Sequence, residues 1–230
     1  MTTAALNIAV LISGGGSNLQ SIIDHIETGL LQASIKLVVS NDPRAGGLER
    51  AKKHAIPTRV VSHLDFASRE QHDAAIVQHL LQAGVEVVCL AGYMRLIGKS
   101  FLHTYPRRIL NIHPSLLPAF PGLDAQQQAA DAGVRFSGAT VHCVDEELDH
   151  GPIILQGAVP AYPGEGRERL ARRILALEHR IYPQALQWLA ADRVRFDEHG
   201  LVQVLPEPQQ AVLRDDQPAC LVNPPLESGF

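Results

Sequence analysis

The chain has 230 residues, of which 46% are hydrophobic and 19% charged, and its 20 basic and 24 acidic side chains give a formal net charge of −4. This composition excludes a wholly disordered chain, because the apolar fraction is high and the net charge is small. The mildly acidic balance gives no electrostatic reason to expect nucleic acid as a partner. No stretch approaches the roughly 20 apolar residues of a membrane-spanning helix, so we expect no membrane association.

Two further features bear on the cellular compartment. The first Lys or Arg of the chain is Lys36, so the basic region of a secretory signal is missing. Cys89, Cys143 and Cys220 are an odd number of cysteines without a CxxC pair, which argues against a disulfide framework and against a thiolate zinc site. We therefore expect a protein of the reducing cytoplasm.

Short apolar runs alternate with amphipathic stretches in the first half of the chain. The runs predict buried strands over residues 7–12, 36–40, 58–61, 85–90 and 109–112. The amphipathic stretches predict helices over about 19–30, 47–54 and 68–83, the last with Ser68 as its N-cap. This alternation indicates βαβ units and an α/β domain with a mostly parallel sheet.

The pattern changes after Gly138. The predicted elements are strands over 139–144 and 153–159, a helix over 166–190 that contains Pro183, and a hairpin of strands over 194–197 and 202–205. Only a turn separates the first two strands, so we expect them to form an antiparallel pair at one edge of the sheet.

The end of the chain differs in composition from the rest. Residues 206–230 are rich in Pro and Gln and lack periodicity. We expect a single domain over residues 1–205, followed by a C-terminal extension that lies outside the core and has no assigned role.

A glycine loop, residues 14–18 (GGGSN), follows the first predicted strand and opens a helix. Backbone N–H groups at such a helix N-terminus bind anions, and glycines let the backbone approach them closely. Leu19 stands where the third glycine of a dinucleotide fingerprint belongs, and the Lys-Ser/Thr pair of a P-loop is missing. The loop indicates a phosphorylated ligand, with a tight turn capped by Ser17 or Asn18 as the structural alternative.

Asn111 and His113 stand two residues apart at the end of a predicted buried strand, so both side chains point to the same side. Ligands of open α/β sheets bind beyond the carboxyl ends of the strands. An amide and an imidazole there are suited to stabilising an oxyanion while handling a proton. Because a histidine at a strand end is often structural, this pair alone does not decide the function.

A charged stretch, residues 145–150 (DEELDH), follows the predicted strand that carries His142. We expect three of its four acids to lie on a solvated face, and one carboxylate beside His113 would favour the imidazolium. A metal site of His113, His142 and Asp149 is an alternative, although the sequence lacks a short-range ligand pair such as HxH or HxxxH.

Four segments together resemble the phosphoribosylglycinamide formyltransferase family, over about residues 7–205. They are ISGGGSNLQ near the start, LAGYMRLI at 90–97, NIHPSLLPAFPG at 111–122 and VHCVDEELDHGPIILQ at 141–156. The glycine loop and the later EHRIYP distinguish this family from other formyltransferases. The resemblance implies a Rossmann-like formyltransferase fold, an open, mostly parallel twisted sheet flanked by helices.

The resemblance also implies a reaction. In it, 10-formyltetrahydrofolate, the co-substrate, donates its formyl group to the amino group of glycinamide ribonucleotide (5-phosphoribosylglycinamide), giving formylglycinamide ribonucleotide and tetrahydrofolate in de novo purine biosynthesis. The implied partners are these small molecules, in a monomer or homodimer, without a metal.

The catalytic residues that the resemblance implies are Asn111, His113 and Asp149. Asn111 and His113 would polarise the formyl oxygen, with His113 as general acid, and Asp149 would keep His113 protonated. The implied ribonucleotide-binding residues are Gly16, Ser17, Asn18 and Glu178, and the implied folate-binding residues are Arg69, Met94, Arg95, Leu96, Ile97 and Asn111. The structural alternatives are an exposed acid for Glu178, core packing at a strand end for the MRLI segment, and a surface helix position for Arg69.

One departure concerns the residue after the implied catalytic aspartate, where the family commonly has glycine and this chain has His150. It could alter the backbone of the loop or add a second titrating group near the site.

Four other functions stay open as alternatives. A formyltetrahydrofolate hydrolase uses a related Asn/His/Asp set, but that family carries an N-terminal regulatory domain, for which a first strand near residue 7 leaves no room. A methionyl-tRNA formyltransferase would need a C-terminal RNA-binding domain. A non-catalytic folate or nucleotide sensor has no need of the proton-handling residues, and the missing third glycine disfavours a dinucleotide-dependent dehydrogenase.

Overall fold

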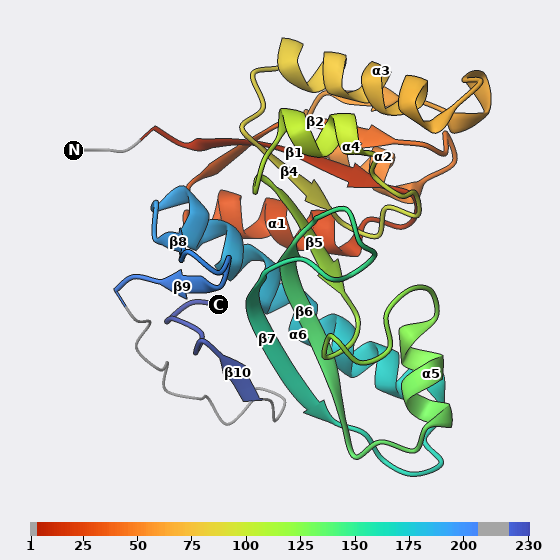
Figure 1. The fold of residues 1–230 in the computed structure, drawn as a ribbon, viewed down its shortest axis with the longest axis vertical. Helices are drawn as coiled ribbons and strands as arrows, with labels where there is room; N and C mark the ends of the chain where they lie inside the picture. Colours follow the sequence, from red (N-terminus) through yellow and green to blue (C-terminus); the bar gives the residue numbers. More distant parts are fainter. Residues whose placement is uncertain (1–3, 207–220) are drawn as a thin grey trace. The chain divides into compact units, whose positions relative to one another are not determined.

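The computed structural model describes residues 4–206 and 221–230 (Figure 1). The chain divides into two compact units. The first comprises Met1–Asn111 with Cys143–Glu146, and the second comprises Ile112–His142 with Glu147–Phe230.

The first unit is built on parallel strands joined by helices. Its strands are β1 (Leu6–Ile12), β2 (Ala33–Ser40), β3 (Thr58–Val60), β4 (Val87–Leu90) and most of β5 (Ile109–His113). Its helices are α1 (Ser17–Glu27), α2 (Gly46–Lys53), α3 (Arg69–Gln82) and the short α4 (Lys99–Thr104), with a 3₁₀ turn, η1 (His63–Asp65). The pairs β1–β2, β1–β4, β2–β3 and β4–β5 are all parallel, as the alternating pattern predicts.

Buried side chains hold this unit together on both faces of its strands. In Figure 1, α3 and α4 lie on one face and α1 on the other. Ile76 and Leu80 of α3 pack in one cluster with Val88 and Leu90 of β4 and Phe101 of α4. Strands buried on both faces read as continuous apolar runs, which is why the sequence located them well.

The second unit is built around an antiparallel pair and a long helix. Its strands are β6 (Phe136–Cys143), β7 (Ile153–Pro160), β10 (Leu221–Asn223) and the separate hairpin of β8 (Val194–Phe196) and β9 (Val202–Val204). Its helices are α5 (Ala125–Asp131) and α6 (Arg167–Ala190). Helix α6 packs closely on β7 at Gly157, where a Cβ atom would lie 2.7 Å from Cδ1 of Leu177.

The strands form one eight-stranded sheet in the order β10-β7-β6-β5-β4-β1-β2-β3, with β8 and β9 apart. This open, mostly parallel α/β sheet confirms the predicted fold class, and β6 and β7 are antiparallel as predicted (Figure 1).

The C-terminal extension departs from the prediction. Within it β10 pairs antiparallel with β7, so β7 is not the edge strand, and Leu226 is buried. The prediction of an extension outside the core is therefore wrong for these residues. Residues 207–220 of the extension, which include Cys220, lie outside the described part of the chain.

The structure also bears on the cysteines and on membrane-spanning segments. The side chains of Cys89 and Cys143 are buried, and burial raises the pKa of the Cys143 thiol to about 12. None of the helices in the described part of the chain combines the length and the apolar character needed to cross a bilayer.

Candidate active site

The glycine loop of the first unit lies against the start of α2. Gly16 has a φ of 70°, and a Cβ atom on it would lie 2.6 Å from Cα of Gly47, so only glycine fits there. Gly47 N donates to Gly14 O (3.1 Å), and Nε of Arg50 donates to Gly15 O (2.8 Å). Helix α2 thus fixes the shape of the loop by donating hydrogen bonds to the carbonyl groups of the loop.

These contacts determine where the loop presents its N–H groups. In a trans peptide the N–H points opposite to the C=O, so the N–H groups of Gly15 and Gly16 face away from α2. The N–H groups of the first turn of α1, which begins at Ser17, have no partners within the helix. A run of N–H donors at a helix N-terminus is the arrangement that binds a phosphate group.

The segment Met94 to Ile97 follows β4, and its two ends are held by hydrogen bonds. Met94 N donates to Oγ of Ser13 (2.8 Å), and Gly98 N donates to Oδ2 of Asp73 (2.7 Å). Between these ends the side chains of Met94 and Leu96 are 62% and 55% exposed. Met94 and Leu96 therefore do not pack in the core, whereas Ile97 packs against it. The exposed side chains are compatible with a ligand-binding segment.

Arg69 lies close to the same segment. It is the first residue of α3, whose N-cap is Ser68 as predicted, with Oγ accepting from Gln71 N. A Cβ atom on Gly98 would lie 3.7 Å from Nε of Arg69. The guanidinium is therefore beside the end of the segment that the resemblance assigns to folate.

His113 of the second unit lies between two hydrogen-bond acceptors. Its Nε2 donates to the carbonyl oxygen of Phe120 (2.9 Å), and its Nδ1 lies 3.4 Å from Oδ2 of Asp149. The same carboxylate oxygen accepts from Gly122 N (2.8 Å). His113 is buried, and the side chain of Asp149 is only 8% exposed. The structure thus brings together His113 and Asp149, the carboxylate that the resemblance implies.

Two side chains of the antiparallel pair support the loop that follows His113. Oγ1 of Thr140 donates to Ser115 O (2.7 Å) and accepts from Leu117 N (3.1 Å). Nε2 of Gln156 donates to Leu117 O (2.9 Å) and to Oγ1 of Thr140 (3.0 Å). Buried hydrogen bonds of this kind hold the backbone of the loop in one arrangement.

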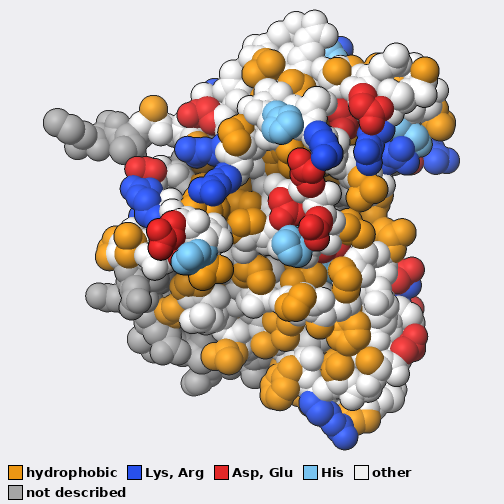
Figure 2. Space-filling model, viewed as in Figure 1, with side chains coloured by type: hydrophobic (Ala, Val, Ile, Leu, Met, Phe, Trp, Pro, Cys, Tyr) orange, Lys and Arg blue, Asp and Glu red, His pale blue; other side chains and the backbone are white. Residues whose placement is uncertain are grey.

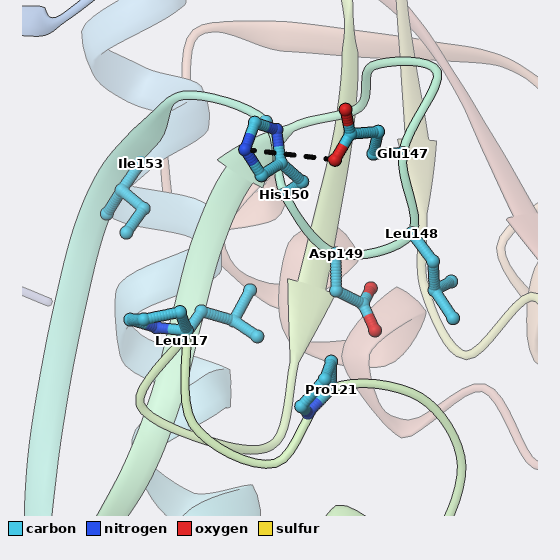
Figure 3. A pocket seen from close by; sticks show the side chains of 9 residues that line it. Leu117, Pro121, Glu147, Leu148, Asp149, His150 and Ile153 are labelled. Atoms are coloured by element: carbon cyan, nitrogen blue, oxygen red, sulfur yellow. Dashed lines mark ion pairs between the residues drawn. The ribbon is translucent and has the colours of Figure 1, made fainter.

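A cavity of about 250 Å³ opens beside Asp149. Its lining is mostly apolar, with Leu117 and Ile153 on one side of Asp149 and Leu148 on the other, and the carboxylate points toward Pro121 (Figure 3). Figure 2 shows hydrophobic side chains gathered on the surface over the part of the chain that carries α5, β6 and β7. An apolar cavity with a buried carboxylate at its wall suits an aromatic or heterocyclic ligand with polar atoms.

The loop of charged residues behaves largely as expected. Glu146 and Glu147 are exposed, and Glu147 lies 4.0 Å from His150 at the cavity wall (Figure 3). The left-handed backbone position of the loop is Asp149, with a φ of 52°, a conformation that Asp tolerates better than most residues. His150 does not have a positive φ, so the backbone does not require glycine at this position. The side chain of His150 adds a titratable group at the cavity wall.

The other predicted residues are distributed over both units. Asn18 of the first unit is buried, as is Glu178 on α6 of the second, so Glu178 is not the exposed acid of the structural alternative. Asn111 pairs in register with Leu90 of β4 and precedes His113 by two residues in β5.

The metal alternative finds no support in the described residues. His142 Nε2 lies 3.9 Å from Oδ1 of Asp149, so this carboxylate lies between His142 and His113. Within residues 4–206 and 221–230, however, no set of three or more His, Cys, Asp or Glu side chains has the geometry to hold a metal ion.

Comparison with known proteins connects this geometry to a family. The family model described as "Formyl transferase" matches residues 6–186. The chain belongs to the formyl transferase family. Phosphoribosylglycinamide formyltransferase of Escherichia coli (strain K12) is 42% identical to it over 195 residues, which cover 85% of this chain and 92% of that one. Among solved structures, glycinamide ribonucleotide transformylase 1 from Symbiobacterium toebii superposes on this formyl transferase with a TM-score of 0.86 at 48% identity, covering 88% of this chain and 95% of that chain.

Some relatives of this formyl transferase are much longer. The trifunctional purine biosynthetic protein adenosine-3 of Drosophila pseudoobscura pseudoobscura is 51% identical over 190 residues, which are 82% of this chain and 14% of that protein. The chain therefore matches one part of that multifunctional protein and nearly all of the bacterial enzyme.

Sequence reasoning missed the residues that hold the site in shape. Ser13 and Asp73 anchor the ends of the exposed segment, Arg50 holds the glycine loop, and Thr140 and Gln156 support the loop after His113. Ser13 alone carried a signal, because it stands directly before the first glycine of the loop.

Proposed function

We propose that this formyl transferase moves the formyl group of 10-formyltetrahydrofolate to the amino group of glycinamide ribonucleotide. The products are formylglycinamide ribonucleotide and tetrahydrofolate, as in de novo purine biosynthesis. The observation that supports this most strongly is the buried pair of His113 and Asp149, whose Nδ1 and Oδ2 atoms lie 3.4 Å apart. The chain that carries this pair matches 92% of the E. coli phosphoribosylglycinamide formyltransferase.

The reaction is a transfer between two nitrogen atoms. The amine of the ribonucleotide attacks the formyl carbon, and the carbonyl electrons move onto the formyl oxygen to give a tetrahedral intermediate. The bond from that carbon to N10 of the folate then breaks as the carbonyl re-forms. The amine nitrogen loses one proton and N10 gains one. Because the amine attacks the formyl carbon directly, no covalent enzyme intermediate is needed.

Asn111 and His113 oppose the charge that develops on the formyl oxygen. Removing one such donor typically lowers the rate about 10²–10³-fold. In the structure Nε2–H of His113 is directed at the carbonyl oxygen of Phe120. The formyl oxygen would replace that carbonyl as the acceptor for Nε2–H, while Nδ1–H of the ring stays directed at the carboxylate of Asp149.

The carboxylate of Asp149 lies beside the His113 ring and helps to orient it. Both neighbours of the His113 ring are acceptors, and only an imidazolium carries the two N–H groups that both acceptors need. His113 gives its Nε2 proton to N10 as the bond from carbon to N10 breaks, and the proton that the amine loses restores the imidazolium.

The ligand-binding assignments follow the two segments of the first unit. The phosphate of the ribonucleotide binds the N–H donors of Gly16, Ser17 and Asn18, and Glu178 contacts the same substrate. The pterin binds along the segment from Met94 through Arg95 and Leu96 to Ile97, with Arg69 near the rest of the folate. The N–H groups of the loop that face away from α2 and the exposed Met94 and Leu96 side chains support these assignments.

The test is a formyl-transfer assay on the full chain. Tetrahydrofolate release from 10-formyltetrahydrofolate is measured with and without glycinamide ribonucleotide. The proposal expects release only when the ribonucleotide is present. Equal release without it would indicate a hydrolase and would remove the phosphate assignment, and binding of folate without release would indicate a sensor.

A further inference from the structure

Ser13 joins two segments of the first unit that are 81 positions apart. Its Oγ accepts a hydrogen bond from Met94 N (2.8 Å), and its own N–H donates to Gly92 O (3.2 Å). Ser13 is also the residue directly before the glycine loop, so one residue contacts both the loop and the exposed segment after β4.

The hydroxyl group of Ser13 both donates and accepts a hydrogen bond in this position. Its hydrogen is directed at Oδ1 of Asn41 (2.5 Å), the residue that follows β2. A serine hydroxyl has one hydrogen to donate, so the contact with Asn41 leaves its lone pairs for Met94 N. Asn41 therefore fixes the rotation of the hydroxyl, and the hydroxyl fixes the start of the exposed segment.

The segment after β4 depends on few such anchors. Side chains at Met94 and Leu96 are mostly exposed, while hydrogen bonds from Met94 N to Ser13 and from Gly98 N to Asp73 hold its ends. A shift of the glycine loop that moves Ser13 therefore moves one of these two anchors directly.

We propose that Ser13 is a positioning residue that couples the ribonucleotide loop to the folate segment, so that binding of either substrate strengthens binding of the other. This inference rests on the proposed function, which assigns the two ligands to these segments. A ligand that orders one segment lowers the entropic cost of ordering the other, and such coupling is necessarily reciprocal.

The test measures two affinities in a complex that cannot react. Tetrahydrofolate lacks the formyl group, so it and glycinamide ribonucleotide can bind together without turnover. Isothermal titration gives the Kd of each ligand alone and at saturation with the other, and their ratio is the coupling factor. For the wild-type chain we expect a factor of about 5 or more, equal in both directions.

Three variants separate coupling from simple stability. Ser13→Ala should bring the coupling factor to within about 2-fold of unity, because the link to Met94 N is lost. Ser13→Thr keeps the hydroxyl and should restore the factor. Ser62→Ala removes another capping hydroxyl of the same unit, one that accepts from Leu64 N, and should leave the factor unchanged. If Ser13→Ala does not fold, Asn41→Ala removes the group that orients the hydroxyl and should lower the factor.

Each outcome has a defined meaning. A wild-type factor of unity, or a Ser13→Ala factor equal to that of the wild type, would overturn the coupling proposal while leaving the proposed reaction intact. Failure of the wild-type chain to bind the ribonucleotide would instead overturn the proposed function itself. If the role of Ser13 were purely structural, Ser13→Ala would weaken binding of both ligands but leave the coupling factor equal to that of the wild type, which would likewise overturn the coupling proposal.

Discussion

Nδ1 of His113 lies 3.4 Å from Oδ2 of Asp149, and the same carboxylate oxygen accepts a hydrogen bond from Gly122 N at 2.8 Å. The carboxylate thus contacts both the imidazole and the loop whose Phe120 carbonyl accepts from the other ring nitrogen. One aspartate side chain thereby links the orientation of the ring to that of the loop around it.

Replacement of His113 tests its role on the reacting atoms. His113→Ala should lower kcat about 10²–10³-fold, because the donor to the formyl oxygen is lost, while the Kd for tetrahydrofolate changes only about 2–3-fold. Steady-state kinetics and titration measure the two effects. His103→Ala, an exposed histidine of α4, is the matched control and should retain full activity. A His113→Ala kcat like that of the wild type would contradict the assignment.

Replacement of Asp149 separates charge from structure. Asp149→Asn keeps an oxygen that can accept from Gly122 N but loses the negative charge beside His113. We expect kcat to fall about 10-fold or more, because a neutral amide does not stabilise positive charge on the ring during proton transfer. Asp131→Asn, at an exposed position of α5, is the control. A kcat of Asp149→Asn equal to that of the wild type would argue against the pairing.

The glycine loop makes a prediction about stability. Gly16→Ala should lower the free energy of unfolding by about 2–4 kcal/mol, because the new Cβ requires both a positive φ and displacement of Gly47. Gly14→Ala is the matched control, since no atom lies within 4 Å of a Cβ there, and its effect should stay within about 0.5 kcal/mol. Urea unfolding measures both. Equal effects would show that the close approach of the loop to α2 is not present in solution.

Asp73 makes a prediction about pH. Burial raises the pKa of this carboxyl, although the hydrogen bond from Gly98 N opposes the shift. The folded protein therefore binds this proton more tightly than the unfolded chain, and the free energy of unfolding falls as the pH rises from near 4 through the raised value. Asp73→Asn keeps an acceptor for Gly98 N without the charge. Its stability relative to wild type should thus increase from about pH 4 to about pH 7.

Urea unfolding of wild type and Asp73→Asn at several pH values measures this difference. Asp42→Asn is a control of opposite sign, because the hydrogen bonds from Arg44 lower the pKa of Asp42. The stability that depends on the charged Asp42 is lost as the pH falls. The free energy of unfolding of Asp42→Asn relative to wild type should therefore decrease as the pH rises. If the difference in free energy of unfolding between Asp73→Asn and wild type did not change with pH, burial would not raise the pKa of Asp73.

The C-terminal segment provides a matched pair of leucines. Leu226 is buried, whereas Leu221 of β10 is 73% exposed. Leu226→Ala should lower the free energy of unfolding by about 2–4 kcal/mol and Leu221→Ala by less than about 1 kcal/mol. Chemical denaturation distinguishes them. Equal, small effects would show that this segment does not pack on the rest of the second unit.

The sequence predicted those parts of the fold whose pattern is local. Strand β1 is a continuous apolar run, and α6 carries a clear helical period, so both were located within one or two residues. Helices α4 and α5 have only six and seven residues and no side-chain cap, too little for a periodic signal. Strand β10 has three residues, and only its pairing with β7 makes it a strand.

The site was predictable only in part for the same reason. The glycine loop and the strand-end His113 are local motifs, and the resemblance selected Asp149 among four neighbouring acids. The hydrogen bond from Met94 N to Ser13 joins residues 81 positions apart, and that from Gly98 N to Asp73 joins residues 25 apart. No local pattern records such contacts, because they exist only once the strands have paired.

The measurement that tests the central claim most directly is the rate of tetrahydrofolate release from 10-formyltetrahydrofolate, with and without glycinamide ribonucleotide, for wild type and His113→Ala. The proposed function predicts that release by the wild-type chain requires the ribonucleotide, that formylglycinamide ribonucleotide forms in equal amount, and that His113→Ala slows both about 10²-fold or more. Release at the same rate without the ribonucleotide would contradict it.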